Sequence, residues 1–179
     1  DINYAEAYLF RGTARYVLEH YDVAIEDFNK AMILDQNYSK EVRIYNLRAS
    51  AYSGQGNFDR AIEDFSKVIE LNPNDDGNYN GRGYVKDMMG DKLGAILDYS
   101  KAISINPKRA ILYNSRGLSK NNLGEYKDAI QDFNLAIEID PYEYLFFSNR
   151  GLAKNNLEDY SGAIQDYTKA IEINPNLAD

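Results

Sequence analysis

The four prolines of the chain constrain its fold more than any other sequence feature. Each proline follows the previous one by 34 residues, and each is preceded by Asn or Asp; they are Pro73, Pro107, Pro141 and Pro175. A fixed period of this length is typical of proteins built from stacked supersecondary units. The 179-residue chain accommodates five units of this length, at residues 5–38, 42–75, 76–109, 110–143 and 144–177. The first unit lacks the proline, and residues 39–41 separate it from the second.

The positions inside each unit, numbered 1 to 34, repeat in type. Positions 4 and 24 are aromatic, position 8 is Gly or Ala, and position 20 is Ala in every unit. Positions 4, 8 and 11, and then 17, 20, 24 and 27, recur at steps of three and four residues, which places each set on one helical face. Gly56, Gly90 and Gly124 in mid-unit and the prolines at position 32 predict where these helices end. Each unit is therefore predicted to be an antiparallel helix pair, and such pairs must stack to bury their apolar faces.

This pattern resembles the tetratricopeptide repeat (TPR) family over residues 5–177. The family pattern has an aromatic at position 4, a small residue at 8, Ala at 20 and 27, an aromatic at 24 and Pro at 32. The resemblance implies an all-α fold, a right-handed α-solenoid of antiparallel helix pairs, with residues 1–179 forming a single array. It also implies a concave groove lined by the first helix of each pair, in which a segment of another protein binds.

The two ends of the chain fall within the repeat phase. Residues 1–4 occupy the phase of 140–143, the end of a unit, and Ala178 and Asp179 would be the first two positions of a sixth. Solenoid ends usually carry a polar capping element. We therefore expect either that the array continues in a longer protein or that its ends are covered by self-association, with the apolar face of helix 160–172 lacking an intramolecular cover.

Two charged residues recur in all five units. Position 7 is always Arg and position 23 is always Asp; the arginines are Arg11, Arg48, Arg82, Arg116 and Arg150, and the aspartates are Asp27, Asp64, Asp98, Asp132 and Asp166. Both positions flank core stripes, which favours ion pairs between helices. The preferred pairing crosses the unit boundary, as in Asp27 with Arg48, and pairing within a unit is the rival. A third interpretation makes the arginines a ligand-binding row.

Partner-binding residues are expected at positions that face the groove in the family, namely 2, 5, 6, 9, 12 and 13 of the first helix. Amides and a few apolar side chains occupy them; the predicted set is Asn46, Asn80, Tyr84, Asn114, Leu118, Asn121, Asn122, Leu145, Ser148, Leu152, Asn155 and Asn156. Amides can both donate to and accept from an extended peptide, and apolar surface among polar groups suits peptide docking. The alternative is that the amides form a solvated polar face or pack against neighbouring helices, and that the leucines pack neighbouring repeats.

Composition narrows the function further. The net charge of −8 disfavours nucleic acid and anionic membranes as partners, and the absence of Cys excludes disulfides and thiolate metal sites. No stretch has the length and apolarity of a signal peptide or a membrane span, which leaves the compartment open and weakly favours the cytoplasm. No cofactor or metal motif occurs, and the single His20 falls in an inter-helix turn without catalytic partners.

The sequence therefore predicts a non-enzymatic scaffold or adaptor that binds a peptide or helix of a partner protein. The alternative is a regulatory or assembly-chaperone segment of a larger protein whose catalytic domain lies elsewhere.

Overall fold

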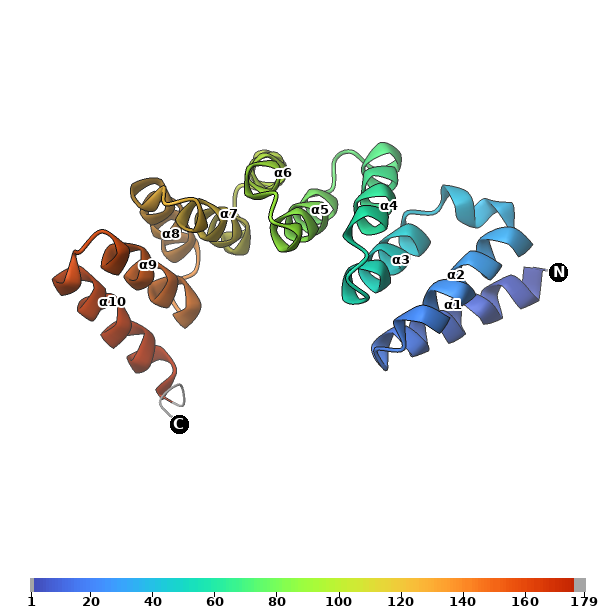
Figure 1. Cartoon of the computed structure of the whole chain (residues 1–179), viewed down its shortest axis with the longest axis horizontal. Helices are drawn as coiled ribbons and strands as arrows, with labels where there is room; N and C mark the ends of the chain where they lie inside the picture. Colours follow the sequence, from blue (N-terminus) through green and yellow to red (C-terminus); the bar gives the residue numbers. More distant parts are fainter. Residues whose placement is uncertain (1, 176–179) are drawn as a thin grey trace. The chain divides into compact units, whose positions relative to one another are not determined.

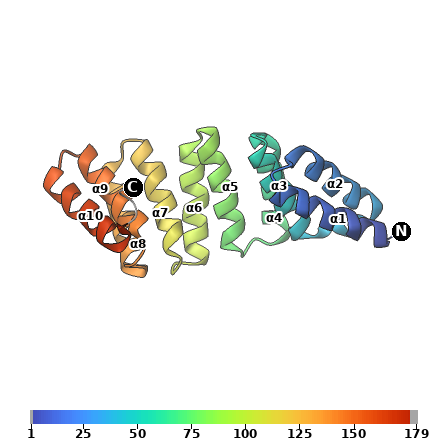
Figure 2. The ribbon, with the colours of Figure 1, turned by 90° about the horizontal axis from the view of Figure 1, so that it is seen from below.

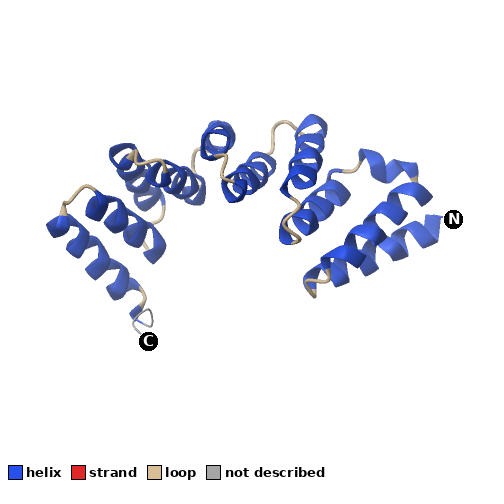
Figure 3. Ribbon diagram, viewed as in Figure 1, coloured by secondary structure: helices blue, strands red, loops and turns tan. Residues whose placement is uncertain are grey.

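The computed structural model describes residues 2–175, and within them the chain is almost entirely helical (Figures 1 and 3). These residues form ten α-helices and one short 3₁₀ helix. The elements are α1 (Ile2–Val17), α2 (Tyr21–Leu34), η1 (Gln36–Lys40), α3 (Val42–Gly54), α4 (Phe58–Leu71), α5 (Asp76–Met89), α6 (Lys92–Ile105), α7 (Ala110–Asn122), α8 (Tyr126–Ile139), α9 (Tyr144–Asn156) and α10 (Tyr160–Ile173).

The helices belong to two compact units, Asp1–Met89 and Gly90–Asp179. In the first unit α1 packs against α2 and α3 against α4, while α2 contacts α3 and α4 contacts α5 (Figures 1 and 2). In the second unit α7 pairs with α8 and α9 with α10, while α6 contacts α7 and α8 contacts α9. The boundary between the units falls inside the third predicted repeat, between α5 and α6, and the organisation as one array stays a prediction.

The turn inside each repeat requires a left-handed backbone at position 15. Gly56, Gly90 and Gly124 adopt φ values of 81°, 95° and 82° there. Glycine suits this region because a Cβ atom strains it. In the first and last repeats the same position holds Glu19 and Glu158, which adopt φ values of 60° and 63°. The turn geometry is thus kept in all five repeats, although two of them lack the favoured residue.

The second helix of each repeat ends at an extended residue at position 31. Asn72, Asn106 and Asp140 have φ values of −139°, −131° and −135°, and each precedes a proline. Proline disfavours the helical region for the residue before it, so the helix ends there. Asp35 is extended as well, and the 3₁₀ helix η1 follows it in place of the proline.

In the first, fourth and fifth repeats the helix pair is held by an alanine and by an aromatic ring that faces a glycine. The position-20 alanines are fully or almost fully buried; they are Ala24, Ala61, Ala95, Ala129 and Ala163. A Cβ atom added to Gly117 would lie 2.7 Å from the Phe133 ring, and one added to Gly12 would lie 2.8 Å from Phe28. The glycine at position 8 therefore lets the ring at position 24 rest on the helix backbone.

The two ends of the described chain differ in part from the sequence-based expectation. Residues 2–4 have the phase of a loop, yet they extend α1, since no proline stands near them to stop the helix. On α10, Ile164 is 65% exposed, whereas Ile25, at the same repeat position in α2, is 7% exposed. The apolar face of α10 is thus open, as predicted. The expected start of a sixth repeat at Ala178 and Asp179 lies outside the described residues.

Candidate functional site

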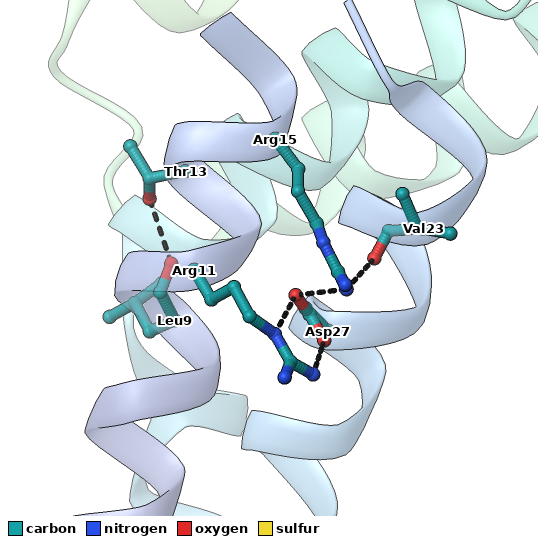
Figure 4. A network of polar contacts seen from close by, with 6 residues as sticks. All are labelled: Leu9, Arg11, Thr13, Arg15, Val23 and Asp27. Atoms are coloured by element: carbon teal, nitrogen blue, oxygen red, sulfur yellow. Dashed lines mark hydrogen bonds and ion pairs between the residues drawn. The ribbon is translucent and has the colours of Figure 1, made fainter. Parts of the chain in front are cut away.

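The position-7 arginine and the position-23 aspartate of one repeat form a bidentate ion pair. In the first repeat Arg11 of α1 reaches Asp27 of α2, with Nε···Oδ2 at 2.9 Å and Nη2···Oδ1 at 2.7 Å (Figure 4). Arg48 pairs in the same way with Asp64, at 2.7 Å for both bonds. The same geometry joins Arg116 to Asp132 and Arg150 to Asp166. The predicted pairing across the repeat boundary is therefore wrong, and the rival pairing within the repeat is right.

In the second to fifth repeats the third nitrogen of the guanidinium forms a hydrogen bond across the repeat boundary. The Nη1 group of Arg48 donates to the Oδ1 atom of Asn29 at 2.6 Å, and that of Arg116 donates to the Ser100 hydroxyl at 3.0 Å. Arg82 and Arg150 reach Ser66 and Asn134 in the same way. All four acceptors stand at position 25 of the preceding repeat. The arginine thus joins the two helices of its own repeat and also ties that repeat to the one before it.

Each guanidinium also lies over the aromatic ring at position 4 of its own helix. The distance from Cζ to the ring centroid is 5.5 Å for Arg48 over Tyr45 and 5.8 Å for Arg116 over Tyr113. This distance is within the range of a cation–π contact. The position-4 aromatic is therefore both a core residue and a support that fixes the arginine.

A second cation at position 11 shares the aspartate in three repeats. Arg15 contacts Asp27, Lys120 contacts Asp132 and Lys154 contacts Asp166, at 2.7 to 2.8 Å. Sequence reasoning assigned position 11 to the core and missed this role. The basic residues at that position were the available indication, and Tyr52 is the exception among the five repeats.

In the last of these clusters the two cations shift the pKa of the aspartate. Burial favours the neutral form of Asp166, but the hydrogen bonds from Arg150 and Lys154 outweigh it and hold the pKa of its carboxyl below the ordinary value. Arg48 is likewise partly desolvated, and its bonds to Asp64 outweigh the desolvation and raise the pKa of its guanidinium. The arginines are therefore engaged in structural ion pairs, which argues against a ligand-binding arginine row.

The predicted partner-binding residues divide into exposed and packed side chains. Leu145, Leu152 and Tyr84 are exposed, as are Asn122, Asn155 and Asn156. Asn46, Asn80 and Ser148 are half-buried. The exposed group lies on the first helices of the pairs, where the resemblance implied a groove.

Three of the predicted residues pack inside the second unit. Asn114 and Asn121 are buried, and their Oδ1 atoms accept hydrogen bonds from Asn149 at 2.8 Å and Asn156 at 3.2 Å. Leu118 packs against the cluster of Ala129, Phe133 and Ala153. These side chains thus join α7 to α9 or pack on the core beneath them, and the expectation that they bind a partner stays a prediction.

Each unit contains a cavity bordered by these helices. In the first unit a cavity of about 500 Å³ is lined by residues of α1 to α5, including Ser50, Asn80 and Tyr84. In the second unit a cavity of about 400 Å³ lies at the α7 and α9 N-termini, beside Ile111 and Leu145. Sequence reasoning named some of the lining residues but foresaw neither cavity.

Among residues 2–175 no cluster of His, Asp and Glu is arranged to hold a metal ion. Nor does any helix in that range have the length and apolarity to cross a membrane. His20 is exposed at the N-terminal boundary of α2 and makes no capping bond through its side chain.

Comparison with solved structures identifies the same arrangement of helix pairs elsewhere. A structure described as the crystal structure of MamA is 26% identical, has a TM-score of 0.81 and covers 93% of this chain and 96% of its own. MamA from Desulfovibrio magneticus is 18% identical with a TM-score of 0.85, covering 98% of this chain and 97% of its own. YrrB is described as a TPR protein with an unusual peptide-binding site. It is 20% identical with a TM-score of 0.75, and the match covers 96% of this chain and 87% of the YrrB chain.

Together these features define an all-α solenoid of antiparallel helix pairs, a fold consistent with a protein-interaction scaffold. The sequence model of the tetratricopeptide repeat matches residues 42–75, 110–143 and 144–177, which is more than half of the chain. The chain therefore belongs to the tetratricopeptide repeat family. A comparison with curated protein sequences gives no match.

Proposed function

We propose that the chain is a non-catalytic scaffold that binds an extended segment of a partner protein on the first helices of its repeats. The observation that carries this proposal is a set of exposed apolar side chains on those helices. Leu145 and Leu152 of α9 and Tyr84 of α5 are all more than two-fifths exposed. Exposed apolar groups set among amides are suited to peptide docking, since they offer both buried area and hydrogen bonds.

The charge distribution supports the same function. At positions 2, 5, 6, 9, 12 and 13 the helices α7 and α9 carry no charged residue, and α1, α3 and α5 carry only Glu6, Arg43 and Asp87. The whole chain, in contrast, has a net charge of −8. The charges of each unit therefore lie mainly at other positions, and these positions of the first helices offer a partner mainly neutral contacts.

The neighbouring structures are consistent with this proposal. YrrB carries a peptide-binding site by its own description, and its fold covers nearly all of this chain.

The test is a peptide selection followed by matched surface variants. A displayed library of random extended peptides is selected on the purified chain, and affinities are measured by calorimetry. The double variant Tyr84→Asp/Leu152→Asp should weaken binding of the selected peptides by tenfold or more, about 1.4 kcal/mol. The control Leu93→Asp/Leu97→Asp changes two exposed apolar residues of α6, a second helix of its repeat, and should leave the affinity unchanged.

Salt provides an independent check. Because the face is nearly uncharged, raising the salt concentration from about 50 to 500 mM should change the affinity by no more than about threefold. Equal losses in the two double variants, or failure to select any peptide, would contradict the proposed function.

A further inference from the structure

The cavity of the first unit lies along the seam between α3 and α5, on the face proposed to bind a partner. Its walls combine residues of these helices with aromatic rings from α1, α2 and α4, and its volume is about 500 Å³. This volume falls within the range of small-ligand pockets and is ample for one large side chain.

Two glycines in the cavity lining let aromatic rings pack against helix backbone. A Cβ atom added to Gly54 would lie 2.5 Å from the Tyr21 ring, and one added to Gly81 would lie 2.6 Å from the Phe65 ring. Both rings therefore rest directly on helix backbones and form walls. Ala49 accounts for the different position of Phe65: in the first, fourth and fifth repeats the equivalent ring rests on a position-8 glycine, but here that position carries a methyl group.

The second unit shows the same seam in a closed form. Leu118, Asn122 and Asn149 of α7 and α9 stand at the repeat positions of Ser50, Gly54 and Gly81. Leu118 packs into the core, and the hydrogen bond from Asn149 to Asn114 spans the two helices. The small residues of α3 and α5 thus leave open a space that larger side chains fill between α7 and α9.

The chemistry of the walls restricts what can occupy the cavity. Tyr16 and Tyr21 form a tilted ring pair with centroids 6.1 Å apart, and Tyr84, 55% exposed, stands with Phe65 among the other lining rings. Partial desolvation raises the pKa of Tyr21, and the nearby Glu19 and Tyr16 raise it further, so the phenol stays neutral at physiological pH. Besides the tyrosine hydroxyls, the polar residues of the lining are Ser50, Ser53 and Asn80.

No residue that lines the cavity is charged. A charged side chain would lose its hydration there without gaining a counter-ion. A purely aliphatic side chain would leave the hydroxyls and the amide without a partner. An aromatic ring that carries a hydrogen-bonding group fits both the ring walls and the polar groups.

We propose that this cavity is a specificity subsite for a tyrosine or tryptophan side chain of the bound segment. The proposal rests on the proposed function and names the residue class that the first unit selects. The same seam in the second unit, closed by Leu118 and the amide bonds, takes no such side chain.

Amino-acid amides test the subsite without knowledge of the partner. N-acetyl-tyrosinamide and N-acetyl-tryptophanamide, titrated to millimolar concentration, should shift the backbone amide NMR signals of Gly54 and Gly81. N-acetyl-leucinamide and N-acetyl-lysinamide should shift them several-fold less. Equal shifts with all four probes, or no shift with the aromatic pair, would overturn the proposal.

A cavity-filling variant supplies the second test. Ser50→Leu introduces the residue that stands naturally at the same position in α7 and α9, so the helix pair should fold. It should weaken binding of the aromatic amides by about tenfold, whereas the matched control Ser161→Leu, on an exposed site of α10, should not. Retained binding in Ser50→Leu, with a native circular dichroism spectrum, contradicts the subsite.

The two proposals fail in different ways. If selected peptides bind and the Tyr84/Leu152 double variant abolishes binding, the proposed function holds whatever Ser50→Leu does. If these peptides carry no aromatic residue and ignore Ser50→Leu, only the subsite is wrong.

Discussion

Asp64 is held by a single cation where the equivalent aspartates of three other repeats have two. Tyr52 stands at the position that Arg15, Lys120 and Lys154 occupy in those repeats. Among the described side chains, Arg48 is the one cation that contacts Asp64, while Asp132 is shared by Arg116 and Lys120. The second repeat therefore depends on its arginine more than the fourth does.

Replacing these arginines should reveal the difference. Arg48→Ala should lower the free energy of unfolding by about 3–5 kcal/mol, because it leaves a buried carboxylate without a counter-ion. Arg116→Ala should lower it by about 1.5–3 kcal/mol, since Lys120 remains beside Asp132. Urea denaturation of both variants measures the two values. A larger loss in Arg116→Ala would show that the second cation contributes nothing.

Acid should destabilise the last repeat through Asp166. The pKa of this carboxyl is lowered in the folded state from about 3.9 in the unfolded chain, so its contribution is complete above pH ~4 and is lost as the pH falls further. Asp166→Asn should therefore be less stable than the parent at pH 7 by roughly 2 kcal/mol, and the difference should shrink below pH ~4. Urea midpoints across this range test it, with the exposed Asp128→Asn as control. A difference independent of pH would contradict the assignment.

At the scale of single helices, the turn between α9 and α10 stores conformational strain. Glu158 adopts φ 63° where three other repeats place glycine. A left-handed backbone costs an ordinary residue roughly 1–2 kcal/mol, and glycine avoids most of it. Glu158→Gly should therefore raise the free energy of unfolding by about 1 kcal/mol, and Gly124→Ala should lower it by a similar amount. Thermal unfolding of both variants checks the sign, and a loss in Glu158→Gly would refute the strain.

Two leucines at the same repeat position should behave differently. Leu118 packs against Phe133 and its neighbours, whereas Leu152 is 42% exposed. Leu118→Ser should destabilise the chain by about 2 kcal/mol, while Leu152→Ser should change stability by less than about 0.5 kcal/mol. Chemical denaturation separates the two, and similar losses would place Leu152 in the core as well.

At the scale of the whole chain, protection against hydrogen exchange should fall at α10. Ile164 and Ile171 of this helix are 65% and 52% exposed, whereas the equivalent Ile130 and Ile137 of α8 are half-buried. The repeats of a solenoid are stabilised mainly by their neighbours. We therefore expect α10 amides to exchange faster than α8 amides in dilute solution, as measured by mass spectrometry. If self-association covers this face, α10 protection should rise with protein concentration, and equal protection at high dilution would contradict the expectation.

The repeat pattern predicted the helices well because its core positions recur five times. Ala24 and its position-20 equivalents are buried in all five repeats, so chance agreement is small. The ion-pair partner was predicted wrongly because Arg48 lies within reach of both its own repeat and the one before, and sequence spacing does not separate the two. The cavity was not predicted because it depends on three small residues together. Ser50 and Gly54 lie on α3 and Gly81 lies on α5, so no single stretch of sequence contains all three.

The hydrogen bond from the arginine to position 25 of the preceding repeat matters when repeats are exchanged between proteins. A cassette cut at the repeat boundary would carry Arg116 but leave behind Ser100, its acceptor on α6. A cassette cut within the turn between the two helices of a repeat would keep Arg116 with Ser100 but would separate it from Asp132 of α8, its bidentate partner. The cut at the repeat boundary therefore keeps the bidentate ion pair, and a repeat moved in this way needs a hydrogen-bond acceptor at position 25 of its new neighbour.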